Sequence, residues 1–391
     1  MEKKQILICC NRTMNIGGIE KVLTTLLKRF DTQRYHILLV IHDTNGPFYD
    51  ELPKDAVDVF YTSSLPVEQY LKDDLKHLRF AKVLQGLWDR LLLRLDKDWY
   101  AKIKYTYRIS RRGLVFPQHF DCAISYSCDY SDLSMVVEAD ADKRIAFVHG
   151  DATYHPRAAR LNDKLVRKLD MVYGVSHEAK DKFLQMHPKY TGKLDVIHNI
   201  FYEDEIRRKA EAPPVDMILD GTLSLCTVAR LAPEKRQYLI PEIARRLVDR
   251  GLRFRWYLVG GGGDREKIEE QIRLHRVQEQ VVLLGPRPNP YPYIKNCDLY
   301  VHTSVHEAYS TAVAEARILC RPIVATDATG NREQFHGDDG LIVSQDPDAI
   351  FNGVYKLLTD EELRRSFIQK QEQAEVYVEY DLPKLYQYIS E

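Results

Sequence analysis

One stretch of the chain, residues 298–325, has the order of elements that builds a parallel α/β sheet. An apolar run, Asp298–His302, precedes a polar loop. A helical pattern then continues to Pro322, where a second apolar run, Ile323–Ala325, begins. Parallel strands need a crossover between them, and a helix in that crossover is the usual solution. The chain is therefore predicted to be of the α/β class.

Two glutamates belong to this unit. Glu307 lies in the loop at the carboxyl end of the first strand, where open α/β sheets bind ligands. Glu315 lies within the helical pattern, and the amides of Ala308–Thr311 are expected to form the helix N-terminus, which favours phosphate. An acid beside an anion site fits a ligand that presents hydroxyls as well as phosphates. A sugar attached to a nucleoside diphosphate is such a ligand.

Composition excludes several other classes of protein. A chain of 391 residues predicts two or three domains, and its net charge of −1 argues against a nucleic-acid binder. No apolar run approaches the length of a membrane span, and the apolar stretch at the start is too short for a signal peptide. Seven cysteines show no metal-binding or paired spacing. We expect reduced thiols in a cytoplasmic protein.

Strand and helix patterns alternate in both halves of the chain and are interrupted by a charged segment around Pro213 and Pro214. This predicts a Rossmann-like domain over residues 1–202, a linker over 203–220, a ligand-binding domain over 221–376 and a tail over 377–391. Two such domains would face each other across a cleft, a common place for small-molecule sites.

Arg230 and Lys235 follow the predicted strand Leu223–Val228 and would lie at the carboxyl edge of the second sheet. Arginine offers a planar fork for phosphate oxygens, and lysine offers a compact charge. The same residues could instead form a solvated basic loop paired with Glu234. The local sequence leaves both readings open.

Two groups of glycines follow predicted strands. Gly260 and Gly261 begin a run of four, and Gly17 and Gly18 lie in the first βα loop. Each group could allow a backbone to approach a nucleotide, or could be a flexible turn. Neither fits the dinucleotide pattern Gly-x-Gly-x-x-Gly, and the ATPase phosphate loop is missing from the sequence.

Two further features carry weaker signals. His149 ends a predicted strand and would point into the cleft, although a lone histidine is more often structural. The Asp-x-Asp motifs at 96–98, 140–142 and 346–348 do not follow apolar strands, so we predict surface carboxylates and no metal site.

The segment 72–112 is strongly basic, because twelve lysines and arginines outnumber five aspartates. Its leucines and tryptophans recur at helical spacing. An amphipathic basic helix of this kind could lie on anionic lipid at the inner face of the plasma membrane. A helix with one face in the core and a solvated basic face would give the same pattern.

With these residues in place, the second half resembles the family 4 glycosyltransferases, enzymes of GT-B fold that are common in capsule and exopolysaccharide synthesis. Glu307 and Glu315 match the paired glutamates of that family, and Arg230 with Lys235 match its basic pair. Residues 222–360 carry the resemblance well. Looser matches in the first half are Gly17–Gly18, His149, Val175–Ser176 and Val196–Asn199.

The resemblance implies a role for each candidate residue. Glu315 would hold the ribose hydroxyls, Arg230 and Lys235 the diphosphate, and Glu307 the hydroxyls of the donor sugar. The remaining nucleotide-sugar contacts would come from Gly17, Gly18, Tyr309, Ser310, Thr311, Gly260, Gly261 and the base-contacting Arg287. His149 would meet the donor sugar or the acceptor. The first domain would form the acceptor side, and the tail over 377–391 would pack back on it.

The resemblance also implies the reaction. A hexose or N-acetylhexosamine would pass from a nucleotide-sugar, with UDP-sugars favoured, to a glycan or lipid-linked acceptor, with retention of configuration and without a metal or other cofactor. The leaving phosphate would help to deprotonate the acceptor. Two alternatives remain open: a non-hydrolysing nucleotide-sugar epimerase of the same fold, which needs no acceptor, and a non-catalytic nucleotide-sugar-binding protein.

Overall fold

The computed structural model describes residues 2–64, 88, 91, 116, 118–149, 162–335, 338–374 and 381–391. The chain forms two compact units. The first consists of Met1–His198 and Tyr380–Glu391, and the second of Asn199–Glu379. Helix α9 (Glu203–Lys209) lies inside the segment that the sequence suggests as a linker, and it is part of the second unit.

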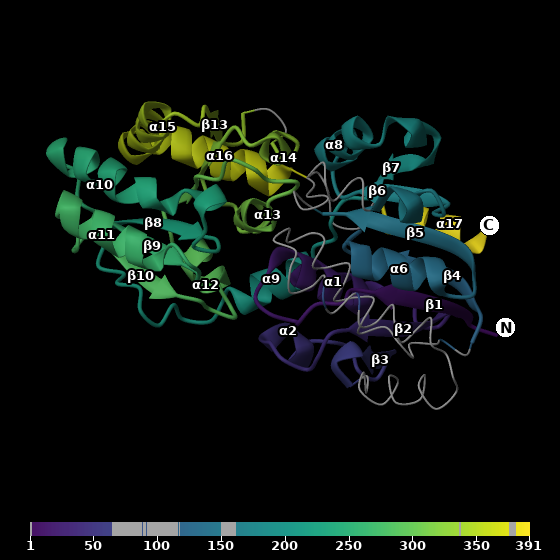
Figure 1. The fold of residues 1–391 in the computed structure, drawn as a ribbon. Helices are drawn as coiled ribbons and strands as arrows, with labels where there is room; N and C mark the ends of the chain where they lie inside the picture. Colours follow the sequence, from purple (N-terminus) through teal and green to yellow (C-terminus); the bar gives the residue numbers. More distant parts are fainter. Residues whose placement is uncertain are drawn as a thin grey trace. The chain divides into compact units, whose positions relative to one another are not determined.

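The first unit is built on a seven-stranded sheet in the order β3-β2-β1-β4-β5-β6-β7, in which all paired strands are parallel (Figure 1). Its strands are β1 (Lys4–Cys9), β2 (Tyr35–Ile41), β3 (Val57–Tyr61), β4 (Phe120–Ser125), β5 (Ala141–Val148), β6 (Met171–Gly174) and β7 (Leu194–Val196). Its helices are α1 (Gly18–Arg29), α2 (Pro47–Asp50), α6 (Tyr130–Glu138), α8 (His177–Met186) and α17 (Leu382–Ser390), with 3-10 turns η1 (Thr62–Ser64) and η3 (Pro188–Lys193). The strand order reverses between β1 and β4, which is the switch point where such sheets bind ligands.

The second unit holds a six-stranded parallel sheet in the order β10-β9-β8-β11-β12-β13 (Figure 1). Its strands are β8 (Leu223–Val228), β9 (Phe254–Val259), β10 (Val281–Gly285), β11 (Leu299–His302), β12 (Ile323–Thr326) and β13 (Leu341–Val343). Its other helices are α10 (Ile240–Asp249), α11 (Arg265–His275), α12 (Tyr291–Lys295), α13 (Thr311–Ile318), α14 (Thr329–Arg332), α15 (Pro347–Thr359) and α16 (Glu361–Gln373), with 3-10 turns η4 (Pro233–Lys235) and η5 (Gln237–Leu239). The predicted α/β class is confirmed.

Burial on both faces explains why the strands read as continuous apolar runs. On β8, Leu225 packs with α10, α11, α15 and α16, whereas the next residue, Cys226, packs with α9, α12 and α13. Ile6, Leu7 and Ile8 of β1 are likewise fully buried. Parallel sheets covered by helices on both faces require such runs.

The C-terminal helix α17 belongs to the first unit. The ring of Tyr386 stacks on Tyr35 with centroids 5.3 Å apart, and its hydroxyl accepts a hydrogen bond from the amide of Asp31 at 2.8 Å. Lys384 Nζ lies 2.6 Å from a carboxylate oxygen of Asp195, the middle residue of β7. Aromatic packing and ion pairing thus fix the tail on the first sheet.

The basic segment 72–112 lies outside the described residues except for Trp88 and Leu91, which are helical and exposed by 59% and 44%. The membrane-surface reading of that segment stays a prediction. Among the described residues, no helix is both long and apolar enough to span a bilayer. All seven cysteines are buried and have free thiols.

Candidate active site

The loops that follow β8 and β11 lie side by side, because these two strands are hydrogen-bonded neighbours. The amide of Val305 donates to the carbonyl of Glu234 at 2.9 Å, and the hydroxyl of Thr303 donates to the carbonyl of Lys235 at 2.6 Å. These bonds join the basic loop to the Glu307 loop. The carboxyl edge of the second sheet therefore brings two of the predicted site segments together.

At this edge two donors meet one carboxylate oxygen. Lys235 Nζ lies 2.6 Å from Glu307 Oε1, and His302 Nε2 lies 2.7 Å from the same atom. The side chains are exposed by 16% for Lys235, 10% for Glu307 and 2% for His302. In the described part of the chain, no donor to Glu307 Oε2 is found. The second oxygen is thus available to accept hydrogen bonds from a ligand.

The charge of Glu307 follows from its partners. Burial alone would raise the pKa of this carboxyl group, but the charge of Lys235 and the hydrogen bond from His302 hold the pKa well below its ordinary value. Glu307 is therefore ionised at neutral pH and acts only as an acceptor. An ionised, nearly buried acceptor suits the hydroxyl groups of a sugar.

Arg230 lies in the same loop as Lys235 but has a different environment. Its side chain is 66% exposed, and its Nη2 lies 2.9 Å from Glu234 Oε1. Of the two readings that the sequence left open, the surface pair with Glu234 holds for Arg230 and not for Lys235. An exposed arginine in a one-turn pair can change partner at little cost.

The glycine run supports the Arg230 loop. Gly260 has a φ of 151°, and a Cβ on it would lie 1.9 Å from the carbonyl oxygen of Ala229. Gly262 has a φ of 153°, and a Cβ on it would lie 2.3 Å from the carbonyl oxygen of Leu231. The amide of Leu231 also donates to the carbonyl of Gly261 at 2.9 Å. Close approach between two stretches of backbone accounts for these glycines.

Helix α13 begins at Thr311, later than the sequence suggests, because Ser310 is its N-cap and accepts from the amide of Val313 at 3.3 Å. Tyr309 precedes the cap and packs its ring 6.0 Å from that of Phe201. Ala308 and Tyr309 are therefore not part of the helix N-terminus. Glu315 lies within α13 and is 1% exposed.

Gly330 supports the Glu307 loop and carries no signal in the sequence. Its amide donates to the carbonyl of Glu307 at 3.1 Å. A Cβ at Gly330 would lie 2.3 Å from the carbonyl oxygen of Ala308, so any larger residue would push the loop away. His302 was also missed, because it ends an apolar strand and reads as a core residue. The structure shows that its ring contacts Glu307, five residues further along the chain.

Arg287 follows β10 and forms an ion pair with Asp216. About a third of the Arg287 side chain and half of the Asp216 side chain are exposed. The structure places Arg287 two residues after β10, and its contact with a base stays a prediction.

The carboxyl edge of the first sheet holds His149, directly after β5. Its ring centroid lies 4.7 Å from that of Tyr126, and no described residue bonds to its buried Nε2 atom. Burial of the ring, together with the charge of Arg12, lowers the pKa of His149 to about 3. The imidazole is therefore neutral at physiological pH and can exchange hydrogen bonds with an uncharged ligand.

Gly17 and Gly18 lie at the start of α1, as the N-cap and the first helical residue. A Cβ on Gly17 would lie 2.2 Å from Glu20 Oε2, at the far end of a flexible side chain. The amide of Lys21 donates to the carbonyl of Gly17 at 3.2 Å. Gly17 thus ends the first βα loop, and Gly18 already belongs to the helix that follows it.

A hydrogen-bonded group of polar residues at the same edge has no counterpart in the sequence reading. The fully buried Asp132 accepts from the amide of Asn11 at 2.8 Å and from the hydroxyl of Ser127 at 2.6 Å. Asp129 caps α6, and Arg12 lies 3.9 Å from it. Burial and the nearby charge of Asp129 raise the pKa of Asp132 well above its ordinary value.

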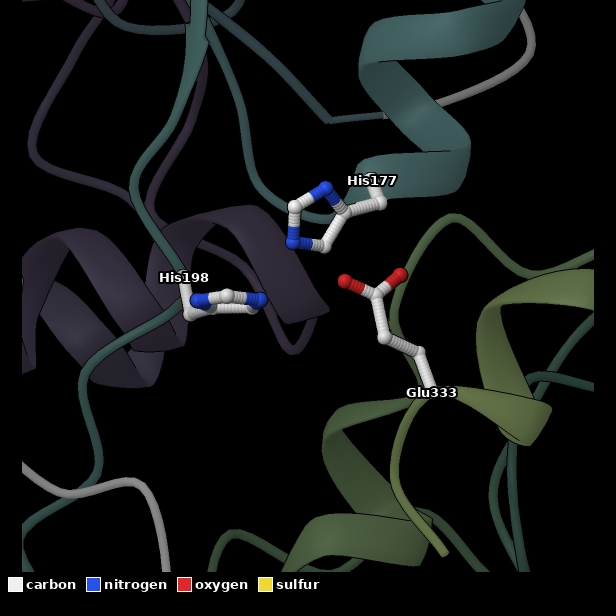
Figure 2. Close-up of side chains that lie close together, drawn as sticks. All are labelled: His177, His198 and Glu333. Carbon is white, nitrogen blue, oxygen red and sulfur yellow. The ribbon is translucent and has the colours of Figure 1, made fainter.

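Two histidines follow strands β6 and β7 of the first unit. They are His177 and His198, and their ring centroids lie 5.8 Å apart (Figure 2). His198 Nδ1 lies 2.7 Å from a carboxylate oxygen of Asp381, at the start of the tail helix. The side chain of Ser176 caps α8. These looser sequence landmarks have structural partners of their own.

The described Asp-x-Asp motifs also have local partners. Asp140 and Asp142 each lie 3.2 Å from a ring nitrogen of His119. Asp346 caps helix α15, and Asp348 pairs with Arg246 at 2.8 Å. The motif at 96–98 lies outside the described residues.

Comparison with known proteins adds the family. Residues 212–374 match the family of glycosyl transferases group 1. The chain is 28% identical over 363 residues to the N-acetylgalactosamine-N,N'-diacetylbacillosaminyl-diphospho-undecaprenol 4-alpha-N-acetylgalactosaminyltransferase of Campylobacter jejuni, covering 92% of this chain and 91% of that one. It is 23% identical to the amylovoran biosynthesis glycosyltransferase AmsD of Erwinia amylovora, covering 93% of each chain.

Solved structures show the same fold. HepE of Anabaena in complex with UDP-glucose superposes with a TM-score of 0.69 at 16% identity, covering 99% of this chain and 98% of that one. The structure of TarM gives a TM-score of 0.71 at 13% identity, covering 99% of both chains. The resemblance drawn from the paired glutamates and the basic pair is thus confirmed. The chain is a glycosyltransferase of GT-B fold, with its group 1 domain in residues 212–374.

Proposed function

We propose that this enzyme transfers a hexose or N-acetylhexosamine from a UDP-sugar to a lipid-linked or glycan acceptor in the synthesis of a surface polysaccharide. The Campylobacter jejuni relative is named for transfer to a diphospho-undecaprenol acceptor, and the Erwinia amylovora relative for amylovoran synthesis. The fold neighbour from Anabaena was solved with UDP-glucose. These names support the substrate classes.

The observation that carries the proposal is the arrangement of Lys235, Glu307 and His302 at the carboxyl edge of the second sheet. An ammonium beside an ionised carboxylate offers one group for phosphate and one for sugar hydroxyls within a single site. In this proposal Lys235 and Arg230 take the diphosphate, Glu307 accepts from the donor sugar, and Glu315 holds the ribose. His149, a neutral imidazole, contacts the donor sugar or the acceptor.

The proposed reaction retains the anomeric configuration. The bond between the sugar C1 atom and the diphosphate oxygen breaks, and a bond from C1 to the acceptor hydroxyl oxygen forms on the same face. The hydroxyl proton passes to an oxygen of the leaving diphosphate. Negative charge develops on that diphosphate, so fixed cations beside it lower the barrier. We propose that Lys235 and Arg230 supply this stabilisation without a metal.

A contact with the membrane surface is part of the proposal, because a lipid-linked acceptor lies in a membrane. The support is the basic composition of residues 72–112, together with the exposure of Trp88 and Leu91. These two apolar side chains are three residues apart, so they share a helix face. We propose that this face meets the anionic inner surface of the plasma membrane.

A thermal-shift panel tests the substrate class. UDP, GDP, ADP and CMP, each alone and as its common sugar conjugates, are added to the full chain. A ligand that binds only the folded state raises the melting temperature. The proposal expects UDP and at least one UDP-sugar to give the largest shifts. A larger shift with another nucleotide would overturn the assignment of the base.

Flotation on lipid vesicles tests the membrane contact. The full chain should float with vesicles that contain phosphatidylglycerol and remain behind with pure phosphatidylcholine. The variant W88A with L91A should float less, because it removes two exposed apolar side chains. Equal recovery with both vesicle types would contradict the proposal.

A further inference from the structure

We propose that His302 is a positioning residue that holds the carboxylate of Glu307 against the donor sugar when Lys235 turns to the diphosphate. The inference rests on the proposed function, since it requires Glu307 to meet the sugar. It assigns to His302 a role that the sequence does not indicate.

The first support is the rigid placement of His302. It is the last residue of β11, and its backbone is in register with Ala325 of β12. Its carbonyl oxygen accepts from the hydroxyl of Thr326 at 3.3 Å. A side chain on a central strand keeps its position better than one on a loop.

The second support is the direction of the hydrogen bond. The ionised carboxylate of Glu307 can only accept, so the His302 Nε2 atom at 2.7 Å must carry the proton. The hydroxyl oxygens of Ser304 and Ser310 lie 3.0 Å and 3.2 Å from the same nitrogen. The ring nitrogen nearest the site is therefore a donor aimed at Glu307.

The third support is the other ring nitrogen. Nδ1 of His302 is buried, and no residue in the described ranges bonds to it. A buried polar atom without a partner is unfavourable, and each instance in a folded protein calls for an explanation. An apolar residue would avoid this penalty at the end of an apolar strand. The contact of Nε2 with Glu307 supplies the explanation.

Glu307 needs His302 because its Oε1 atom is shared between two donors. Lys235 and His302 both donate to Glu307 Oε1, and only Lys235 has a long, flexible side chain. When a diphosphate draws the ammonium away, Glu307 would be left buried without its cation, which is strongly unfavourable. His302 stays in place and keeps Oε1 bonded. Oε2 then remains directed to the sugar.

The role predicts a selective defect. His302 is buried, and the ligand contact belongs to Glu307. Loss of the ring nitrogen should therefore weaken contacts with the sugar and leave contacts with the nucleotide unchanged. General damage to the fold would weaken both.

Calorimetric titration of the full chain tests this selectivity. The ligands are UDP and the UDP-sugar that gives the largest thermal shift with the wild type. H302L should bind the UDP-sugar about tenfold more weakly, the scale of one charge-assisted hydrogen bond, with UDP affinity unchanged. H302Q should recover most of the loss, because its amide nitrogen can occupy the place of Nε2. H275L, at the end of α11, is the matched histidine control and should behave as wild type.

A double-mutant cycle with E307A separates the mechanism from a direct effect. If His302 acts through Glu307, then H302L has no further effect on UDP-sugar binding in the E307A background. A tenfold loss that persists there would overturn the inference, and so would equal losses for UDP and UDP-sugar. If H302L fails to fold, H302N replaces it, because the shorter amide cannot reach Glu307.

This experiment distinguishes a failure of the proposed function from a failure of the role of His302. If the wild type binds no UDP-sugar, the proposed function falls, and the inference falls with it. If the wild type binds a UDP-sugar and H302L binds it equally well, only the role of His302 is lost.

Discussion

The carboxyl edges of the two sheets both bury an acid, yet the two acids have opposite electrostatic character. On the second sheet, Glu307 has an ammonium and an imidazole at one oxygen, and its pKa lies well below the ordinary value. On the first sheet, the donors to Asp132 among the described residues are neutral, and its pKa lies well above the ordinary value. His149 at that edge is neutral because burial lowers its pKa to about 3.

The difference shows that partners, and not burial, decide whether a buried acid is charged. The edge with Lys235 carries opposite charges and suits a diphosphate beside sugar hydroxyls. The edge with Asp132 and His149 favours uncharged forms and suits hydroxyl groups. In the proposed function, the charged edge binds the nucleotide-sugar, and the neutral edge offers hydrogen bonds to a sugar or acceptor.

Removing Lys235 should have the largest effect. K235A takes a cation from the leaving diphosphate and should lower turnover about a hundredfold. It also leaves Glu307 without its ammonium, at a cost of about 2 kcal/mol in stability, because the pair is largely buried. Turnover and the melting temperature measure the two effects. The control K295A removes a more exposed pair with Glu211 and should change neither.

Arg230 gives the sharpest contrast within the same loop. R230A should also lower turnover about a hundredfold, if Arg230 leaves Glu234 for the diphosphate. Its effect on stability should stay below about 0.5 kcal/mol, since the pair with Glu234 is exposed. Normal turnover would instead leave Arg230 as a surface residue. A drop in melting temperature as large as that of K235A would break the comparison between the two cations.

The neutral edge predicts a smaller, pH-dependent effect. The folded pKa of His149 is about 3, below its ordinary value of 6.5, so the unfolded chain binds this proton more readily. Stability should therefore fall as the pH is lowered through about 6.5. Between about pH 7 and pH 5.5, the loss due to His149 is about 1 kcal/mol. Chemical denaturation at both pH values should show a correspondingly smaller loss in H149Q.

A second histidine provides a control of opposite sign. Asp140 and Asp142 raise the pKa of the exposed His119, so its contribution is present at low pH and lost as the pH rises. H119Q should therefore not reduce the loss of stability at low pH. The same reduction in H119Q and H149Q would contradict the assignment of the effect to His149.

The strands were largely predictable from the sequence, because both faces of each sheet are buried. Leu223–Val228 is a strand with the predicted bounds. The pattern does not predict β3, an edge strand whose Asp58 is exposed, or β13, which has only three residues. Apolar periodicity is weak where one side of a strand meets solvent or the strand is very short.

The contents of the candidate site were less predictable than its location. The sequence placed Lys235 and Glu307 at strand ends, but the alternative partner it offered for Lys235 was Glu234, one residue away. The true partner, Glu307, is 72 residues away and is reached because β8 pairs with β11. Strand order decides such contacts, and a single sequence does not state it. The contact of His302 with Glu307 spans only five residues, but it depends on the path of the loop after β11, which apolar periodicity does not predict.

The central claim is that Glu307, held at the charged edge, is the residue that meets the donor sugar. Calorimetric titration of wild type and E307A with UDP and with the preferred UDP-sugar tests it most directly. The account predicts that E307A binds the UDP-sugar about tenfold more weakly and binds UDP as the wild type does. Equal weakening of both ligands, or unchanged affinity for the UDP-sugar, would contradict it.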